Sequence, residues 1–242
     1  MEIEIINDWL VAETEITKST NDDALFFELP KDGNKKFVFC AKKQTSGRGR
    51  LGRKWDDGEG NLMFSAIVKC SNNDAGRLAL VSGISVLKTI KEYDASANLS
   101  LKWPNDVLLN DKKVCGILIE RKDDANMVVG IGVNIKNAPV LENKHYQATS
   151  LQDCKIAATR KDFLRRFLKI FNEWLEKIEK KEFNFIKETW MNNAKNINQP
   201  VEIENIKGKT AGKLIGVDEE CAIIVEKDNK QIKIYTGDVS YL

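Results

Sequence analysis

The sequence predicts an α+β domain over residues 1–195, followed by a small β-barrel domain over residues 196–242. In the first part, short β-prone runs alternate with long segments whose apolar residues recur at spacings of three and four, which is typical of mixed strands and helices. After Pro200 the pattern changes to short alternating strands separated by polar turns. A chain of 242 residues is long enough to bury one large core and a smaller one.

The strands of the first domain are expected where apolar and β-branched residues cluster between polar breaks. These runs cover residues 10–16, 37–42, 62–69, 99–103, 107–109, 112–120 and 127–135. Asn110 and Asp111 stand between two of the runs, and this pair predicts a tight hairpin turn. In the second domain, strands are expected over residues 201–204, 210–217, 222–226 and 231–235.

Four helices are expected. Thr20 is a suitable N-cap for a first helix that runs through Leu29. Residues 74–93 form a second, buried helix, and residues 183–193 form a short last one. The longest helix follows Thr159, which with Asp162 resembles a capping box. Its apolar stripe is expected to belong to the core and consists of Phe163, Phe167, Ile170, Phe171, Trp174 and Ile178.

Composition excludes several classes of protein. The net charge is only +2, from 38 basic and 36 acidic residues, whereas a dedicated nucleic-acid-binding protein has a marked basic excess. The N-terminus has acidic residues and no basic segment, so a signal peptide is not expected. No apolar run approaches the roughly 18 residues that a membrane span requires. We therefore expect a cytoplasmic protein that does not contact membranes.

Cysteine and histidine usage narrows the chemistry further. Five scattered cysteines without a CxxC pair indicate free thiols in a reducing compartment rather than disulfides or a zinc site. His145 is the only histidine, which argues against a histidine-based metal site and against a Ser/His triad. Hydrolases that depend on such groups are thereby disfavoured.

A concentrated positive loop, QTSGRGRLGRKW, covers residues 44–55. Arginine guanidiniums match phosphates and carboxylates in pairs of hydrogen bonds, and glycines allow backbone amides to approach anions. Taken alone, this loop is equally suited to binding RNA, to clamping a phosphate on a small ligand, or to simple solvation.

Two other motifs favour the phosphate interpretation. In KWPND, residues 102–106, the proline enforces an extended segment that aims Lys102, Asn105 and Asp106 in fixed directions. An amide and a carboxylate of this kind suit Mg²⁺ held jointly with substrate phosphates, or an incoming amine. An ordinary turn at a strand edge is the alternative. Lys113, just after the expected hairpin turn, can place its ammonium beside a reacting carboxylate or phosphate.

The strand VVGIGVNI, residues 128–135, carries two glycines on one face. Gly130, Gly132 and Asn134 share that face because side chains alternate along a strand. Two bare positions allow a flat group to lie on the backbone, with Asn134 as a polar anchor at its end. Close packing by another element is the alternative.

In this order, QTSGRGRLGRKW, KWPNDV, KKVCGILIE and GIGVNI resemble the motifs of the biotin protein ligases, and the earlier STN and later ATSL agree. The resemblance runs from about residue 10 to the C-terminus. It implies a mixed sheet of seven strands flanked by helices, followed by an SH3-like β-barrel. It also implies ATP and Mg²⁺ as co-substrate and metal, biotin as substrate, and no zinc.

The implied reaction has two steps. The biotin carboxylate attacks the α-phosphate of ATP and gives biotinyl-5′-AMP and pyrophosphate. The ε-amine of one lysine on a biotin carboxyl carrier domain, belonging to acetyl-CoA carboxylase or a related carboxylase, then attacks the anhydride and releases AMP. The family includes monomers and homodimers, so either state is expected.

The resemblance also implies roles for individual residues. Lys113, Asp106 and Arg48 are the catalytic candidates, with Arg48 on the biotin carboxylate and α-phosphate and Asp106 orienting the acceptor amine or accepting its proton. The biotin site is expected to comprise Ser19, Thr20, Asn21, Gln44, Gly47, Arg48, Lys113, Gly116, Gly130 and Gly132. The ATP and adenylate site is expected to comprise Arg50, Arg53, Trp55, Lys102, Asn105, Asp106, Lys113 and Asn134.

Some features depart from the pattern. Leu51 and Cys115 stand where other members carry a cation and an alanine, and Leu51 is expected to alter the dynamics of the loop. About 18 residues precede the STN motif, too few for the DNA-binding domain of the repressor members, so neither DNA binding nor repression is expected.

Three alternatives stay open. A non-catalytic biotin-binding protein and a non-catalytic nucleic-acid-binding protein are two of them, and salt-dependent RNA binding without ATP turnover would favour the latter. A ligase of lipoyl or octanoyl groups is the third, but it would carry a glycine-rich motif with a histidine that this sequence lacks.

Overall fold

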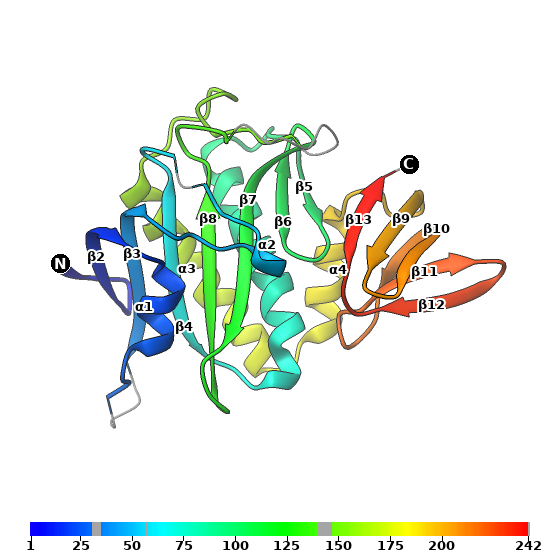
Figure 1. Cartoon of the computed structure of the whole chain (residues 1–242), viewed down its shortest axis with the longest axis horizontal. Helices are drawn as coiled ribbons and strands as arrows, with labels where there is room; N and C mark the ends of the chain where they lie inside the picture. Colours follow the sequence, from blue (N-terminus) through cyan, green and yellow to red (C-terminus); the bar gives the residue numbers. More distant parts are fainter. Residues whose placement is uncertain (31–34, 57, 140–146, 242) are drawn as a thin grey trace.

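A computed structural model of the chain describes residues 1–30, 35–56, 58–139 and 147–241. The described residues form two β-sheets and four α-helices (Figure 1). His145, the single histidine, lies outside the described residues.

The larger sheet has eight strands in the order β1-β2-β3-β4-β8-β7-β6-β5. Their bounds are β1 Glu2–Ile6, β2 Trp9–Thr17, β3 Lys36–Gln44, β4 Leu62–Lys69, β5 Leu99–Lys102, β6 Asp106–Leu109, β7 Lys112–Arg121 and β8 Asn126–Val133. Strands β2 and β3 are parallel and the other neighbours are antiparallel, so the sheet is mixed, as expected. It has one strand more than the seven implied by the resemblance, because β1 pairs with the edge of β2.

Helices cover both faces of this sheet (Figure 1). They are α1 Thr20–Phe26, α2 Ala75–Tyr93, α3 Arg160–Glu179 and α4 Phe183–Asn193. On β4, Phe64 packs against Phe167 of α3, whereas the next residue, Ser65, contacts Asn21 of α1. Because neighbouring residues of a strand point to opposite faces, α1 and α3 lie on opposite sides of the sheet. No helix in the described part of the chain is long and apolar enough to cross a membrane.

The long helix α3 confirms its predicted capping and core stripe. Thr159 is the N-cap, and its hydroxyl accepts a hydrogen bond from the Asp162 backbone amide at 3.2 Å. Phe163, Phe167 and Phe171 are fully buried beneath the sheet. Burial of such aromatic side chains contributes about 1.5–3 kcal/mol each relative to exposure, so this stripe holds the helical layer on the sheet.

The first helix differs from the prediction at both ends. Its N-cap is Ser19 rather than Thr20, because Ser19 is still extended, with φ −159° and ψ 130°. The helix ends at Phe26 rather than Leu29, since Phe27 returns to an extended conformation. The proline at position 30 also disfavours helical backbone at the residue before it.

Two turns place functional residues. Asn110 and Asp111 have φ values of 51° and 64° and connect β6 to β7, which confirms the predicted hairpin turn. The KWPND segment forms the turn between β5 and β6, where Lys102 pairs with Asp106 across the two strands. The plain interpretation of this pentapeptide, a turn at a strand edge, is therefore correct, and the turn also presents Lys102 and Asp106 together.

The C-terminal part forms a five-stranded antiparallel sheet in the order β12-β11-β10-β9-β13. Its strands are β9 Pro200–Asn205, β10 Gly208–Val217, β11 Ile223–Lys227, β12 Lys230–Ile234 and β13 Asp238–Tyr241. The sequence did not predict β13. The predicted small antiparallel β-domain is therefore present, but among the described residues its sheet is not closed into a barrel, because the end strands β12 and β13 pair only with β11 and β9. A division of the chain between residues 195 and 196 stays a proposal.

Candidate active site

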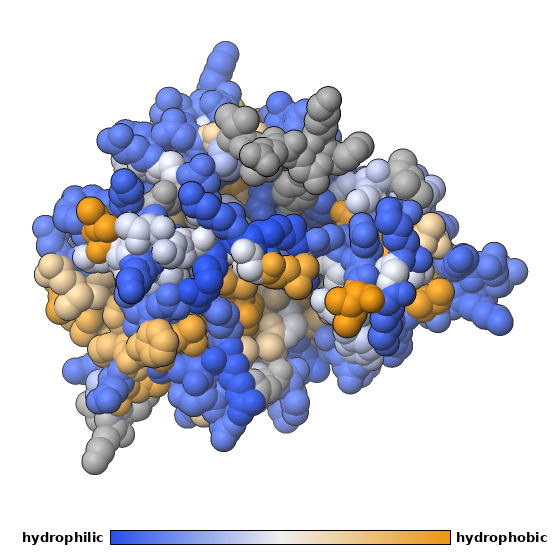
Figure 2. All heavy atoms as spheres, in the orientation of Figure 1, coloured by the Kyte–Doolittle hydropathy of each residue, from blue (hydrophilic) through white to orange (hydrophobic). Residues whose placement is uncertain are grey.

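The predicted site residues gather on the α1 face of the large sheet. The loop after β3 crosses this face toward the C-terminal sheet (Figure 1), and hydrophilic side chains cover the same region (Figure 2). Within the loop, a bridge between Arg48 and Lys54 and a hydrogen bond from Gly49 N to Arg53 O give it a folded shape of its own. Leu51, at its tip, has φ 57° and is exposed.

A cluster of cations lies where the loop meets β6 and β7. Lys113 Nζ is 2.6 Å from Asp106 Oδ1, and both side chains are mostly buried. The Arg50 guanidinium donates to Asn105 Oδ1 at 3.4 Å, while Asn105 Nδ2 donates to the Ile117 carbonyl at 2.7 Å. The Ile117 contact fixes the amide so that its oxygen faces the cations. The sequence motifs thus converge as predicted.

Burial disfavours the charged forms of two cations in this cluster, Arg50 and Lys102. The pKa of Arg50 is lowered, chiefly because burial disfavours its charged form, although Asp238 opposes the shift. The pKa of Lys102 is lowered for the same reason, with Asp106 opposing it. Buried cations that are held at such a cost favour the arrival of an anion, because the anion restores the solvation that they lost.

The C-terminal part of the chain adds three residues that the sequence did not predict, Gly237, Asp238 and Tyr241. Asp238, at the start of β13, lies 2.5 Å from Arg53 and 3.7 Å from Arg50. The Arg50 guanidinium also donates to the Gly237 carbonyl, at 3.4 Å. Tyr241 lies against Lys102, whose Nζ is 5.3 Å from the ring centroid. No sequence signal indicated these residues, since their role depends on how the two sheets sit together.

Trp55 lies on the glycines of β7 and β8. A Cβ at Gly132 would come within 2.3 Å of the indole, and one at Gly116 within 2.7 Å. Lys113 Nζ lies 5.4 Å from the centroid of the same ring. The bare face predicted from the sequence therefore exists, and in this structure the flat group on it is the protein's own indole.

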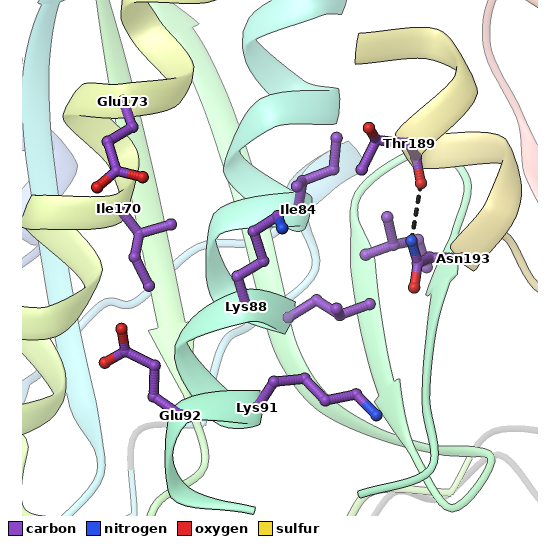
Figure 3. Close-up of a pocket in the computed structure, with 10 residues that line it drawn as sticks. Ile84, Lys88, Lys91, Glu92, Ile170, Glu173, Thr189 and Asn193 are labelled. Atoms are coloured by element: carbon purple, nitrogen blue, oxygen red, sulfur yellow. Dashed lines mark hydrogen bonds between the residues drawn. The ribbon is translucent and has the colours of Figure 1, made fainter. Parts of the chain in front are cut away.

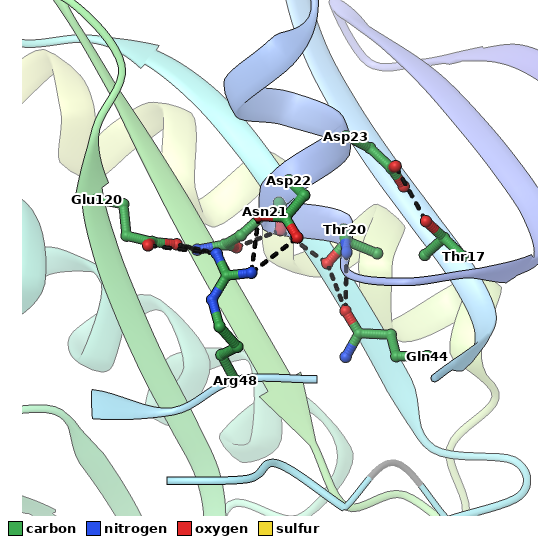
Figure 4. A network of polar contacts seen from close by, with 9 residues as sticks. Thr17, Thr20, Asn21, Asp22, Asp23, Gln44, Arg48 and Glu120 are labelled. Atoms are coloured by element: carbon green, nitrogen blue, oxygen red, sulfur yellow. Dashed lines mark hydrogen bonds and ion pairs between the residues drawn. The ribbon is translucent and has the colours of Figure 1, made fainter. Parts of the chain in front are cut away.

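Gly130, the other glycine of this face, lies beneath Asn21 rather than Trp55. A Cβ there would come within 2.0 Å of Asn21 Oδ1. That oxygen accepts a hydrogen bond from Ser65 Oγ at 2.5 Å, and Asn21 Nδ2 donates to Glu120 at 2.6 Å (Figure 4). Asn21 is 4% exposed, so a buried, fully oriented amide stands at this end of the site.

Thr20 and Gln44 complete the polar group around Asn21. Gln44 Oε1 accepts from the Thr20 amide at 2.8 Å and from its hydroxyl at 3.2 Å (Figure 4). Ser19 is buried beside them. Gly47 lies over Gln44, because a Cβ there would be 2.9 Å from Gln44 Nε2. The residues predicted for the biotin site are thus brought together.

Arg48 belongs to this polar group rather than to the cation cluster. Its Nη1 lies 2.7 Å from Asp22, and its Nη2 lies 3.3 Å from Glu120 (Figure 4). The hydrogen bond to Asp22 raises the pKa of Arg48. The predicted contact of Arg48 with a carboxylate and a phosphate stays a prediction, while Arg50 occupies the position beside Asn105.

Asn134 is buried just beyond β8. Its Nδ2 donates to the Thr149 carbonyl at 3.0 Å, and its Oδ1 has no hydrogen-bond partner among the described residues. Through these contacts Asn134 holds residues 149–151 against the start of β7. Its predicted contact with an adenylate stays a prediction.

Two cavities in the described part of the chain lie away from these residues. One of about 430 Å³ lies among α2, α3 and α4 on the opposite face of the sheet (Figure 3). Another, of about 400 Å³, lies at the start of α3. None of the predicted site residues lines either cavity, because Trp55 and Asn21 cover the glycine face.

The arrangement has two adjoining parts with different chemistry. One is the polar group around Asn21, which includes the ion-paired Asp22, Arg48 and Glu120 and suits a small ligand with hydrogen-bond donors and an acceptor. The other is a cation cluster around Lys113 that suits phosphate and carboxylate oxygens. A reaction that joins a carboxylate to a phosphate between the two parts requires this pairing, because the cations offset the repulsion between the anions.

Comparisons with known proteins agree with this geometry. Residues 13–135 match the sequence model of the biotin/lipoate A/B protein ligase family, and residues 197–242 match that of the biotin protein ligase C-terminal domain. A biotin protein ligase from Aquifex aeolicus, solved in complex with biotin and ATP, superimposes with a TM-score of 0.82 at 31% identity. The match covers 95% of this chain and 97% of that one.

Two curated relatives are similar in sequence. The biotin–[acetyl-CoA-carboxylase] ligase of Paracoccus denitrificans is 31% identical over 224 residues, covering 86% of this chain and 91% of that protein. The bifunctional ligase/repressor BirA of Bacillus subtilis is 30% identical over 212 residues, covering 84% of this chain. The alignment spans 65% of the length of that BirA.

Proposed function

Since the chain belongs to the biotin/lipoate A/B protein ligase family, we propose that it is an ATP-dependent biotin protein ligase. It forms biotinyl-5′-AMP from biotin and ATP and transfers the biotinyl group to a lysine of a biotin carboxyl carrier domain. The observation that carries the proposal is the junction of an oriented amide pocket at Asn21 with a buried cation cluster at Lys113.

The first step joins two anions. A carboxylate oxygen of biotin attacks the α-phosphorus, the new P–O bond forms, and the bond to the pyrophosphate leaving group breaks. Lys113 and Arg50 stabilise the charge that develops on the phosphoryl oxygens, and the polar group around Asn21 holds the ureido ring. The buried positions of Lys113 and Arg50 support these roles, since electrostatic stabilisation is stronger away from water.

The second step transfers the biotinyl group to an amine. The acceptor amine attacks the carbonyl carbon of the anhydride, AMP departs with its oxygen, and the amine loses a proton. Asp106 orients the amine or accepts that proton, and its carboxylate is held in place by Lys113 at 2.6 Å. Trp55 covers the anhydride and limits its hydrolysis, which agrees with its position on Gly116 and Gly132.

We propose that Mg²⁺ arrives with the ATP phosphates. The described residues contain no group of three or more His, Cys, Asp or Glu side chains able to hold a metal alone. Asn105 Oδ1 and the Asp106 carboxylate offer two oxygens, which suits an ion that takes one or two protein ligands together with phosphates. When bound, the ion neutralises phosphate charge.

The acceptor is proposed to be the carrier domain of acetyl-CoA carboxylase or a related carboxylase, because the name of the Paracoccus relative includes acetyl-CoA carboxylase. A cytoplasmic location is proposed because all five cysteines are free thiols, which is typical of a reducing compartment.

The experiment that tests the function is a biotinylation assay with a mass readout. The purified chain is mixed with biotin, MgATP and a biotin carboxyl carrier domain, and the carrier is weighed by mass spectrometry. We expect the mass of one biotinyl group on the carrier, absent when ATP is omitted or when the acceptor lysine is replaced by arginine.

Pyrophosphate release separates the alternatives when no mass is added. Release that depends on biotin, without transfer, would mean that the adenylation site works and the acceptor was wrong. Absence of both would refute the proposal and favour a protein that only binds biotin or nucleic acid.

A further inference from the structure

Asp22 and Glu120 are two carboxylates of the site that the proposed reaction does not use. Asp22 lies in the first turn of α1, and Glu120 lies near the end of β7. Both contact Arg48, which thereby bridges elements that are far apart in the sequence. We call Asp22, Arg48 and Glu120 together the clasp (Figure 4).

The clasp fastens one end of the loop after β3. At its other end the loop is tied to the C-terminal sheet by Arg53 and Asp238, 2.5 Å apart. The backbone of Trp55 closes the loop on itself through a hydrogen bond to the Gly47 carbonyl at 2.9 Å. Gly47 directly precedes Arg48 in the chain. Opening the clasp would therefore loosen the backbone contact between Gly47 and Trp55 that holds Trp55 in place.

Glu120 has a second task that Asp22 lacks. It accepts a hydrogen bond from Asn21 Nδ2 at 2.6 Å while it faces the Arg48 guanidinium. A carboxylate accepts and cannot donate, so only the NH₂ end of the amide can face it. Ser65 Oγ donates to the other end at 2.5 Å, and the two contacts together fix which way the Asn21 amide points.

The direction of that amide matters for a cyclic urea. The ureido ring offers two N–H donors and one carbonyl acceptor, so it needs an acceptor and a donor at defined places. One lone pair of Asn21 Oδ1 accepts from Ser65, and one hydrogen of Nδ2 is donated to Glu120. The remaining lone pair and hydrogen therefore face the ureido ring with the acceptor and the donor each at a fixed position. An amide free to flip would present them in the wrong order half of the time.

We propose that Glu120 is a positioning residue that sets the polarity of Asn21 for the ureido ring and, through Arg48, fastens the covering loop over it. The inference rests on the proposed function and goes beyond it by adding Glu120 and Asp22 to the site. Arg48 acts here as the link between loop and pocket. Each ion pair of the clasp is partly exposed, so its effect is on the site and its loop rather than on global stability.

Three variants separate the two tasks. Glu120→Gln removes the charge that holds Arg48 and replaces an acceptor with a group that also donates, so it disturbs both the loop and Asn21. Asp22→Asn weakens only the clasp. Glu15→Gln is the matched control, since it removes the carboxylate of an exposed ion pair with Lys42 on β2 and β3.

Two measurements on the full chain follow these variants. The first is the KM for biotin and for MgATP in biotin-dependent pyrophosphate release. The second is the initial rate of trypsin cleavage between residues 48 and 54, identified by peptide mass. Glu120→Gln should raise the KM for biotin about tenfold, leave the KM for MgATP within about twofold, and accelerate cleavage. Asp22→Asn should accelerate cleavage and raise the KM for biotin less than Glu120→Gln does, and the control should match wild type.

Two outcomes would overturn the inference. One is a Glu120→Gln variant whose biotin KM and cleavage rate equal those of wild type. The other is a proportional loss in both KM values and kcat with a lower melting temperature, which would indicate general damage to the fold. Wild-type protein that releases no pyrophosphate with biotin would instead refute the proposed function, and the cleavage rates would then decide on the clasp alone.

Discussion

Replacing Gly130 with alanine tests the idea that this glycine exists to make room for Asn21. A Cβ at position 130 would lie 2.0 Å from Asn21 Oδ1, whereas ordinary contact begins at 3.4 Å. The amide must therefore retreat by about 1.4 Å, the difference between these two distances. A shift of that size breaks the 2.5 Å contact with Ser65 or the 2.6 Å contact with Glu120.

The cost follows from the two contacts. A hydrogen bond between neutral groups contributes about 0.5–1.5 kcal/mol, and one to a charged group about 1.5–3 kcal/mol. Loss of the weaker contact alone would weaken biotin binding about twofold to tenfold, and loss of both would weaken it about thirtyfold to two-thousandfold. We expect a value between these limits, together with a small fall in melting temperature because the same two contacts lie within the folded protein.

Isothermal titration with biotin measures this effect directly. Gly83→Ala in α2 is the control, since its Cβ would meet only side-chain methyls, of Leu101 at 3.3 Å and Ile117 at 3.8 Å, and alanine favours a helix. Biotin affinity unchanged from wild type in Gly130→Ala, with the fold intact, would refute the assignment of Gly130 to Asn21.

Three further predictions concern the cation cluster and the thiols. Asp238→Asn should lower the KM for MgATP by up to about fivefold, because Arg50 loses a competing carboxylate. It should change stability little, because Asp238 and its nearer partner Arg53 are about half exposed. Asp228→Asn is the control for steady-state kinetics. Burial lowers the pKa of Lys102 below its ordinary 10.5. The folded protein then releases the Lys102 proton at a pH where the unfolded chain retains it, so the free energy of unfolding rises with pH over that interval. Over the same interval the KM for MgATP should rise, because Lys102 loses its positive charge. Lys102→Arg should shift this rise in KM to higher pH. Burial raises the pKa of four of the five cysteines, to about 11 for Cys70. Iodoacetamide should therefore label the half-buried Cys154 first. Peptide mass mapping identifies the labelled cysteine.

Each of the three has a result that contradicts it. An unchanged or raised KM for MgATP in Asp238→Asn would mean that the carboxylate does not compete with phosphate. Equal pH profiles for wild type and Lys102→Arg would remove Lys102 from nucleotide binding. Labelling of the other thiols at the rate of Cys154 would contradict their burial.

The sequence alone predicted the helices and most of the strands, but not β1 and β13. Strand and helix positions followed from local periodicity, and the hairpin at Asn110 and Asp111 followed from turn residues that tolerate positive φ. The glycine face of β8 followed from alternation along a strand, which any extended chain obeys. Such properties depend on near neighbours, so they can be predicted without the fold.

The tertiary structure decided which side chains meet. Glu120 contacts Asn21 across 99 positions, and Arg50 contacts Gly237 across 187, through sheet register and the packing of the two sheets. Trp55 covers Gly132 because the loop folds back on itself, and the C-terminal sheet stays open because β12 and β13 pair with different strands. These contacts between distant residues depend on the closing of long loops and on strand order, which local periodicity does not encode.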